Sequence, residues 1–230
     1  MSTEKMIQKE IGSYISTLLR NYFGKGPISV YVTVADRYIT IHLRGFLSQT
    51  EKILLKQQEI KRVLEIRNLL MKDLKPEIKL HLYKIGQFSV SEIYTDWNVD
   101  DQTGLIFVIL KEKTKQAALP WPAKVDESAV YREVMISSET AQKVPDSINI
   151  SWLNNRTILI KRSGIFMKIE AELIEDGYIE QLKQAKRRLE KKLLKQSALE
   201  ELLRRKIEEI YLDWNFKEDE GYIILLLEPQ

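Results

Sequence analysis

Residues 92–110 read EIYTDWNVDDQTGLIFVIL, and residues 209–227 read EIYLDWNFKEDEGYIILLL. The two stretches align without a gap, 117 positions apart, with nine identities in nineteen positions. Residue composition alone gives roughly one or two identities over this length. The chain therefore carries the same segment twice, and this repeat decides the fold.

The repeat extends upstream of this segment at slightly different offsets. The matched residues include Pro27 with Pro145, Gly45 with Gly164 and Glu51 with Glu170. The offset changes in turns and helices, where a duplicated fold tolerates insertions. We therefore predict two copies of one module, at residues 1–112 and 127–230, joined by a linker at residues 113–126. The second module is the more divergent.

Each copy has the periodicity of helix, strand, strand, helix, strand, strand. In the first copy, apolar residues between Ile7 and Tyr22 repeat at helical spacing. Residues 28–34 and 38–46 alternate between apolar and polar, which is typical of a half-buried hairpin. The predicted class is α+β, with two tandem α-β-β-α-β-β modules. Each module is an antiparallel four-stranded sheet with helices packed on one face.

The second helical region of each copy carries start and stop signals. The stretch Ser48-Gln49-Thr50-Glu51 is a capping box, which predicts a long helix to about Lys75. Pro76 has no backbone N–H, so we expect a second, shorter helix to begin there and to end at Gly86. In the second copy, Ser197-Ala198-Leu199-Glu200 is the predicted capping box.

A single module of this length buries only a small core. We therefore expect the two copies to pack together as a pseudo-dimer. The linker contains the sequence ALPWP at residues 118–122, and its two prolines predict a stiff, extended segment.

Composition and charge exclude several classes of site. The chain has no cysteine, which excludes disulfides, thiolate metal sites and cysteine nucleophiles. Its 36 basic and 33 acidic residues nearly balance, so the net charge of +3 does not by itself indicate a polyanionic partner. The longest apolar runs, residues 104–110 and 222–227, fit buried strands and are far shorter than the ~20 residues of a spanning helix. We expect a cytoplasmic protein with no transmembrane segment.

The two histidines give the first candidate site. His42 lies beside Arg44 on the polar side of its predicted strand, and Tyr31 and Thr33 lie on the neighbouring strand. These four residues could bind a small molecule or anion or transfer a proton, or they could form a solvated sheet face, which we favour. His81 is expected at the surface. Neither histidine has the spacing of a metal site, so no metal and no cofactor are predicted.

The repeated Asp-Trp-Asn motif gives the second candidate. Asp96 with Asn98, and Asp213 with Asn215, could act in acid–base chemistry or hold a cation. They could instead bond the turn that follows each strand while the tryptophan packs below. We favour the structural role because no nucleophile or base accompanies either carboxylate.

A basic stretch lies in the second copy. Residues 183–206 contain ten basic residues against Glu190, Glu200 and Glu201, which could bind nucleic acid or anionic lipid. The preceding segment is acidic, and acid early and base late along a helix complements its dipole. The aromatic residues typical of single-strand binders are missing. We therefore favour a solvated helix face over nucleic-acid binding.

The first copy resembles a known bacterial family through the stretch GKGPISVYVTV, the later ITIHLRGFLSQTEKILL, and the DWNxDxxxG motif. This family is named after the C component of a Na⁺-translocating membrane-potential-generating system (MpsC, or YbcI-like). The resemblance covers residues 5–112 and, more loosely, 127–228. The second copy departs from it at residues 161–166. The resemblance implies a small protein without established catalysis and an accessory role beside a cation or inorganic-carbon transport system.

Three functional hypotheses follow. The first is a non-enzymatic accessory or regulatory protein that contacts a protein partner, such as a membrane transport complex, around residues 44–51. The second is a small-molecule or anion-binding module at His42 and Arg44. The third is nucleic-acid binding by residues 183–206. No nucleophile–base pair or cofactor loop is present in the sequence, so an enzyme is the class least favoured.

Overall fold

The computed structural model describes residues 3–229, and the chain divides into two compact units, residues 1–117 and 118–230. The boundary falls inside the segment predicted as a linker. Residues 114–116 pair with the first unit, since Thr114 N donates to Asp36 O and Asp36 N donates to Gln116 O. Leu119 N donates to Trp152 O of the second unit. We call the units module 1 and module 2.

Both modules have the predicted order of elements. Module 1 contains α1 (Thr3–Phe23), β1 (Ser29–Ala35), β2 (Tyr38–Arg44), α2 (Gln49–Lys56), α3 (Ile60–Gly86), β3 (Val90–Asn98) and β4 (Thr103–Leu110). Module 2 contains α4 (Glu127–Ala141), β5 (Ser147–Trp152), β6 (Thr157–Ser163), α5 (Lys168–Glu175), α6 (Ile179–Gln196), α7 (Leu199–Leu203), β7 (Ile207–Asn215) and β8 (Glu220–Leu227).

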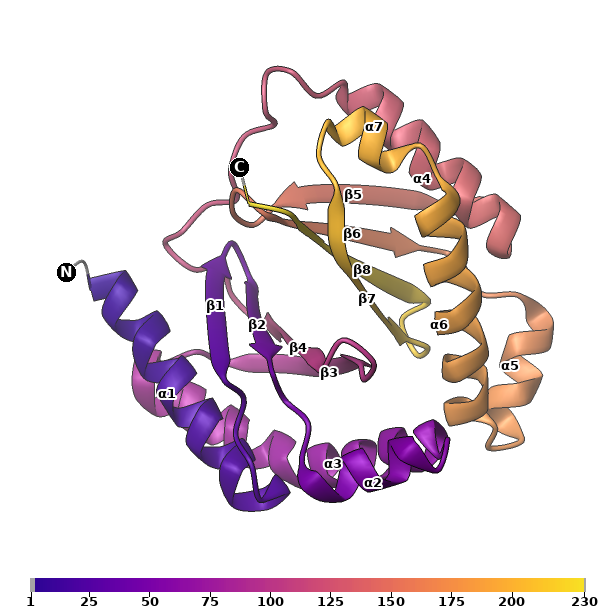
Figure 1. Ribbon diagram of the computed structural model, residues 1–230. Coiled ribbons are helices and arrows are strands. Elements are labelled where there is room, and N and C mark those ends of the chain that lie inside the picture. The colour runs from indigo at the N-terminus through magenta and orange to yellow at the C-terminus, as the bar shows by residue number, and fades with distance from the viewer. Residues whose placement is uncertain (1–2, 230) are drawn as a thin grey trace. The chain divides into compact units, whose positions relative to one another are not determined.

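Each module has one antiparallel four-stranded sheet, in the order β1-β2-β4-β3 in module 1 and β5-β6-β8-β7 in module 2. In module 1, helices α1 and α3 lie on one face of the sheet (Figure 1). The core forms between them and includes Ile15, Ile41, Leu74 and Trp97. The predicted α+β class, with helices on one face of each sheet, is confirmed. The predicted pseudo-dimer stays a prediction.

The expectation of a half-buried hairpin is wrong for β2. The apolar residues of β2, Ile39, Ile41 and Leu43, face the core as the alternation predicts. Tyr38, Thr40 and His42 on the opposite face are buried as well. The reason is the strand order: β2 lies inside the sheet between β1 and β4, where the rings of Tyr38 and Phe107 stack. On this face of the β1–β2 hairpin, the exposed side chains are Tyr31 on the edge strand β1 and Arg44 at the end of β2.

The predicted helix break at Pro76 is also wrong. The capping box at Ser48 and Glu51 forms as predicted, but it starts the short helix α2, which ends at Lys56. Helix α3 then runs without interruption through Pro76. Pro76 and Lys72, whose carbonyl loses its donor, are both exposed, so water can bond that carbonyl.

The break between α2 and α3 occurs instead at Gln58, which has a positive φ of 61°. The corresponding residue in module 2 is Gly177, with φ of 84°. Glycine adopts this left-handed conformation without steric cost and marks the break in the second copy. In the first copy this turn has a glutamine, so the sequence there gives no glycine signal for the break.

The capping box predicted at Ser197 and Glu200 does not form. The N-cap of α7 is Ala198, and the Glu200 carboxylate accepts from Ile207 N instead. The Ser197 hydroxyl donates to Leu194 O at the end of α6. The break itself is present, so the counterpart of α3 in module 2 is split into α6 and α7.

Candidate functional site

A buried ion pair lies at the centre of module 1. Arg67 on α3 is fully buried, and its Nε and Nη2 atoms donate to the two Glu51 carboxylate oxygens at 2.7 and 3.1 Å. Arg67 Nη2 also donates to Phe46 O, and its guanidinium lies over the rings of Phe46 and Trp97. This bidentate geometry is one that only arginine provides.

Glu51 joins this pair to the start of α2. Its carboxylate accepts from Ser48 N at 2.7 Å, as the capping box requires. Burial alone raises the pKa of the Glu51 carboxyl, but the bonds from Arg67 and Ser48 outweigh it and hold that pKa below the ordinary value of 4.5. The pair therefore remains charged and fixes the loop after β2 to the helices.

Module 2 has the equivalent pair with a lysine. Lys186 and Glu170 stand 119 positions after Arg67 and Glu51, and Lys186 Nζ donates to Glu170 Oε1 at 2.8 Å. The ammonium lies over the rings of Phe166 and Trp214. Burial lowers the pKa of Lys186 against the opposing effect of Glu190 and Glu170.

A second buried pair completes the network of module 2. Arg162 Nη2 donates to Glu190 Oε2 at 2.5 Å, and Arg162 Nη1 donates to Ser138 Oγ. At the equivalent positions module 1 has the buried apolar residues Leu43, Met71 and Leu19. The contacts of Arg67 and Lys186 join helices to one another, and those of Arg162 join β6 to α4 and α6, so we interpret both clusters as structural.

The predicted Tyr31, Thr33, His42 and Arg44 cluster does lie on one sheet face. Tyr31 pairs with His42 across β1 and β2, and their rings stack with centroids 6.0 Å apart. Arg44 is exposed, and Thr33 is half-buried. His42, however, is only 8% exposed, so the solvated face that we favoured for it is wrong.

The register brings Asp96 and Asn98 onto the same face of module 1. Leu105 on β4 pairs with His42 on one side and with Asp96 on the other. His42 and Asp96 are thus two strands apart, about 10 Å. Asp96 is buried, and its Oδ1 accepts from Trp97 N at 2.8 Å. This is the local backbone bond expected of a structural role.

Asp213 and Asn215 also make structural contacts. Lys183 Nζ and Trp214 N both donate to Asp213 Oδ1, at 2.6 and 2.8 Å. Burial raises the pKa of the Asp213 carboxyl, but Lys183 and Arg187 outweigh it and lower that pKa. Asn215 Oδ1 accepts from Glu218 N in the turn that follows.

Half of the ten basic residues in the stretch 183–206 make contacts inside module 2. Besides the buried Lys186 and the pairs with Asp213, Lys191 lies over the Tyr211 ring and Arg205 donates to Asn155 O. The exposed basic residues of α6 include Arg188, Lys192 and Lys195. These internal contacts weigh against a continuous nucleic-acid surface.

Half of the segment proposed as a partner surface, residues 44–51, is buried. Phe46, Leu47, Ser48 and Glu51 are buried, because this loop carries the capping box and packs on Arg67. His81, expected at the surface, is half-buried and stacks on Tyr14 of α1 with ring centroids 3.3 Å apart.

Sequence reasoning missed an exposed apolar stripe on α3. Its residues repeat every three or four positions on the side of the helix opposite the core; they are Ile66, Leu69, Pro76, Leu80 and Tyr83, with Asp73 among them. Leu69 is 67% exposed and Leu80 is 55% exposed. The spacing was readable in the sequence, but helical periodicity does not say which of two apolar faces lies outside. We call this set the α3 stripe.

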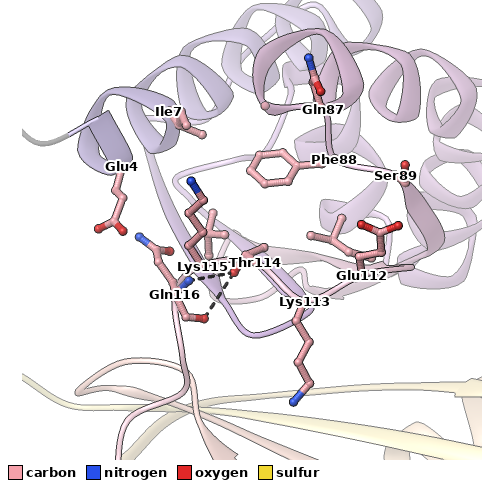
Figure 2. A pocket seen from close by; sticks show the side chains of 13 residues that line it. Glu4, Ile7, Gln87, Phe88, Ser89, Glu112, Lys113, Thr114, Lys115 and Gln116 are labelled. Carbon is pink, nitrogen blue, oxygen red and sulfur yellow. Dashed lines mark hydrogen bonds between the residues drawn. The ribbon is translucent and has the colours of Figure 1, made fainter.

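Module 1 contains a cavity of about 570 Å³ beside the start of α1 and the end of β1 (Figure 2). Its apolar lining residues are Ile7 of α1, Val34 of β1, Leu110 of β4, and Phe88, which lies between α3 and β3. The Phe88 ring points toward Ile7. Polar residues of the 112–116 segment complete the wall, while the Lys113 side chain points away. No predicted site residue lines this cavity.

Comparison with known proteins identifies one family. Residues 3–112 and 134–229 each match the family described as Na⁺-translocating membrane potential-generating system (MpsC). No curated protein and no solved structure matches the chain. Across residues 3–229, every helix is too short or too polar to cross a bilayer.

Proposed function

Because the chain belongs to the MpsC family, we propose that it is a non-enzymatic accessory or regulatory protein of a Na⁺-translocating membrane potential-generating system. In this proposal it is cytoplasmic and peripheral to a cation or inorganic-carbon transport complex. It acts through contacts with a protein subunit of that complex. The family name supports the association, and the α3 stripe supports the mode of contact.

The observation that carries this proposal is the exposure of the α3 stripe. Solvent-exposed helix faces are usually polar, and contiguous exposed apolar side chains mark interaction sites. The stripe repeats every three to four residues, which is the spacing that packs against another helix. The positions of α6 that correspond to Ile66, Leu69, Asp73 and Pro76 are Ala185, Arg188, Lys192 and Lys195. Module 2 therefore carries three exposed basic side chains over this part of the helix face.

The charges on the stripe favour a different protein over a second copy. Asp73 lies near the middle of the stripe, so an antiparallel pair of identical α3 helices would bring two Asp73 carboxylates close together. Like charges across a helix interface are destabilising. The partner that fits is an amphipathic helix with an apolar face and a basic residue opposite Asp73.

The test is capture from detergent-solubilised native membranes with the tagged full chain. We expect the subunits of a Na⁺-translocating complex to be retained by the wild-type chain. The double variant Leu69→Arg/Leu80→Lys should lose them by about tenfold or more, because it places charges in an apolar contact. Asp73→Lys should weaken capture by opposing the partner's basic residue.

The matched control is Leu189→Lys, which changes an exposed leucine on α6 of module 2. It should capture as well as the wild-type chain. All variants change exposed side chains, so each should retain the free energy of unfolding within about 0.5 kcal/mol. Equal capture by Leu69→Arg/Leu80→Lys and by the wild-type chain would contradict the proposal.

A further inference from the structure

The cavity of module 1 is separate from the α3 stripe. Its apolar wall comes from α1, β1, β4 and the start of the β3 region, and no residue of the stripe lines it. It lies at the end of β1, which is an edge strand of its sheet. The duplicated fold offers an internal comparison, since module 2 has the same corner.

In module 2 this corner is occupied by the chain itself. Trp121 packs against the core, with its ring centroid 6.2 Å from the rings of both Tyr131 on α4 and Trp152 at the end of β5. Two residues earlier, Leu119 N donates to Trp152 O at 2.7 Å and forms a β-bridge. An extended Leu-Pro-Trp segment thus adds to an edge strand and places its aromatic ring in the corner.

The register shows that the two corners correspond. Trp152 pairs with Ile158, as Val34 pairs with Ile39, and the two pairs are equivalent in the repeat. Val34 therefore occupies the edge position whose carbonyl binds Leu119 in module 2. In module 1 two parts of the chain lie at this corner. The first turn of α1 lines the cavity through Glu4 and Ile7, and residues 114–116 line it while they bond Asp36, just beyond the end of β1. The equivalent positions of module 2, residues 123 and 126, precede α4.

We propose that the module 1 cavity binds an extended segment of a partner protein with the pattern Leu-x-Trp. The backbone of the segment adds to the edge of β1 at Val34, as peptides add to exposed sheet edges elsewhere. The aromatic side chain, two residues later, enters between Ile7 and Phe88. Trp121 in module 2 is the intramolecular version of this ligand. This inference is independent of the α3 stripe and of the proposed function.

The probe is a capped synthetic peptide of residues 117–123, AALPWPA, titrated into the isotope-labelled full chain. We expect saturable amide shifts at Val34, Phe88 and Ser89. Ile7→Trp fills the cavity and should weaken binding about tenfold or more. The control Met6→Trp adds the same ring one position away, at a side chain that is 56% exposed and does not line the cavity. Its affinity should equal that of the wild-type chain.

A second measurement does not depend on how the variants fold. The same peptide with Trp121→Ala should lose binding to the wild-type chain, because the ring supplies the buried apolar area. Equal affinity of the two peptides would overturn the proposal. So would an absence of saturable shifts, or shifts confined to Tyr131 and Trp152, which would mean that the peptide only exchanges with Trp121 in module 2.

Discussion

The buried centres of the two modules solve the same packing problem with different numbers of charges. In its buried centre module 1 has the ion pair of Arg67 with Glu51, and Leu43 and Met71 are apolar residues of the same core. Module 2 keeps the equivalent pair as Lys186 with Glu170. It also replaces the two apolar residues by a second ion pair; these residues are Arg162 and Glu190.

This difference shows that the two kinds of buried ion pair have different roles in the fold. The pair found in both modules ties the loop after the second strand to the long helix, through a carboxylate that also caps the next helix. The pair found only in module 2 stands where apolar side chains serve equally well in module 1. A buried ion pair is often no more stabilising than apolar residues of similar volume, whereas half of such a pair is costly.

The largest expected effect is the loss of half of the second pair. Glu190→Met should destabilise module 2 by about 3–5 kcal/mol, because Arg162 then stays buried without its carboxylate. The free energy of unfolding, from urea titration followed by circular dichroism, measures the cost. A cost below about 1 kcal/mol would show that Arg162 reaches water or another acceptor.

The double variant Arg162→Leu/Glu190→Met gives module 2 the apolar residues of module 1. We expect it to recover the loss, leaving stability equal to that of the wild-type chain or higher by up to about 4 kcal/mol. The difference between the double variant and the sum of the single variants measures the coupling of the pair. A double variant as unstable as the single ones would mean that module 2 cannot repack like module 1.

A smaller effect should distinguish the shared pairs by their pH dependence. The pKa of Glu51 is lower in the folded chain than its ordinary value of 4.5, so the unfolded chain binds more protons in acid. The stability that the Glu51 carboxylate contributes is fully present above the unfolded-state pKa of 4.5. This stability is lost as the pH falls through the pKa of Glu51 in the folded chain. Glu51→Gln should therefore flatten the acid limb of stability below about pH 4.5.

Lys186 should act at the other end of the pH scale. Its pKa is lower in the folded chain than the ordinary 10.5, so the unfolded chain keeps its proton longer and stability rises with pH toward that value. Lys186→Met should remove this alkaline rise, whereas Glu51→Gln, which leaves Lys186 in place, should keep it. Urea titrations at a series of pH values test both variants, and identical pH profiles for the two would refute the assignment.

The smallest effect concerns the turn before each long helix. Gln58 in module 1 and Gly177 in module 2 both have positive φ. A side chain costs about 1 kcal/mol in this conformation. Gln58→Gly should therefore stabilise module 1 by up to about that amount, and Gly177→Gln should destabilise module 2 similarly. Thermal unfolding measures both, and changes of the same sign would contradict the equivalence of the two turns.

Much of the fold was predictable because it depends on local patterns that occur twice. The repeat gave the module order, the alternation gave the strands, and the Ser48–Glu51 capping box was found where it was expected. Pro76 misled the prediction because proline is tolerated on the exposed side of a helix. Gly177 carried the correct signal for the break, but only the second copy shows it.

The candidate sites were less predictable. Glu51 and Glu170 matched in the alignment, yet their partners lie on helices whose charges resemble those of an ordinary solvated face. The cluster at His42 and the Asp96 motif turned out to share one sheet face, because the pairing of β2 with β4 and of β4 with β3 links residues far apart in the chain. The cavity involves four elements and has no motif of its own.

The sequence by itself determined the duplication, the α+β class and the membership of each copy in one family, because these depend on residue identity and short-range periodicity. Only the tertiary structure decided which charges are buried, which apolar face of α3 is exposed, and that Trp121 fills a corner that is open in module 1. Burial depends on contacts between residues that are distant in the chain. A helix with apolar residues on two sides does not reveal, before it is packed, which side the core will take.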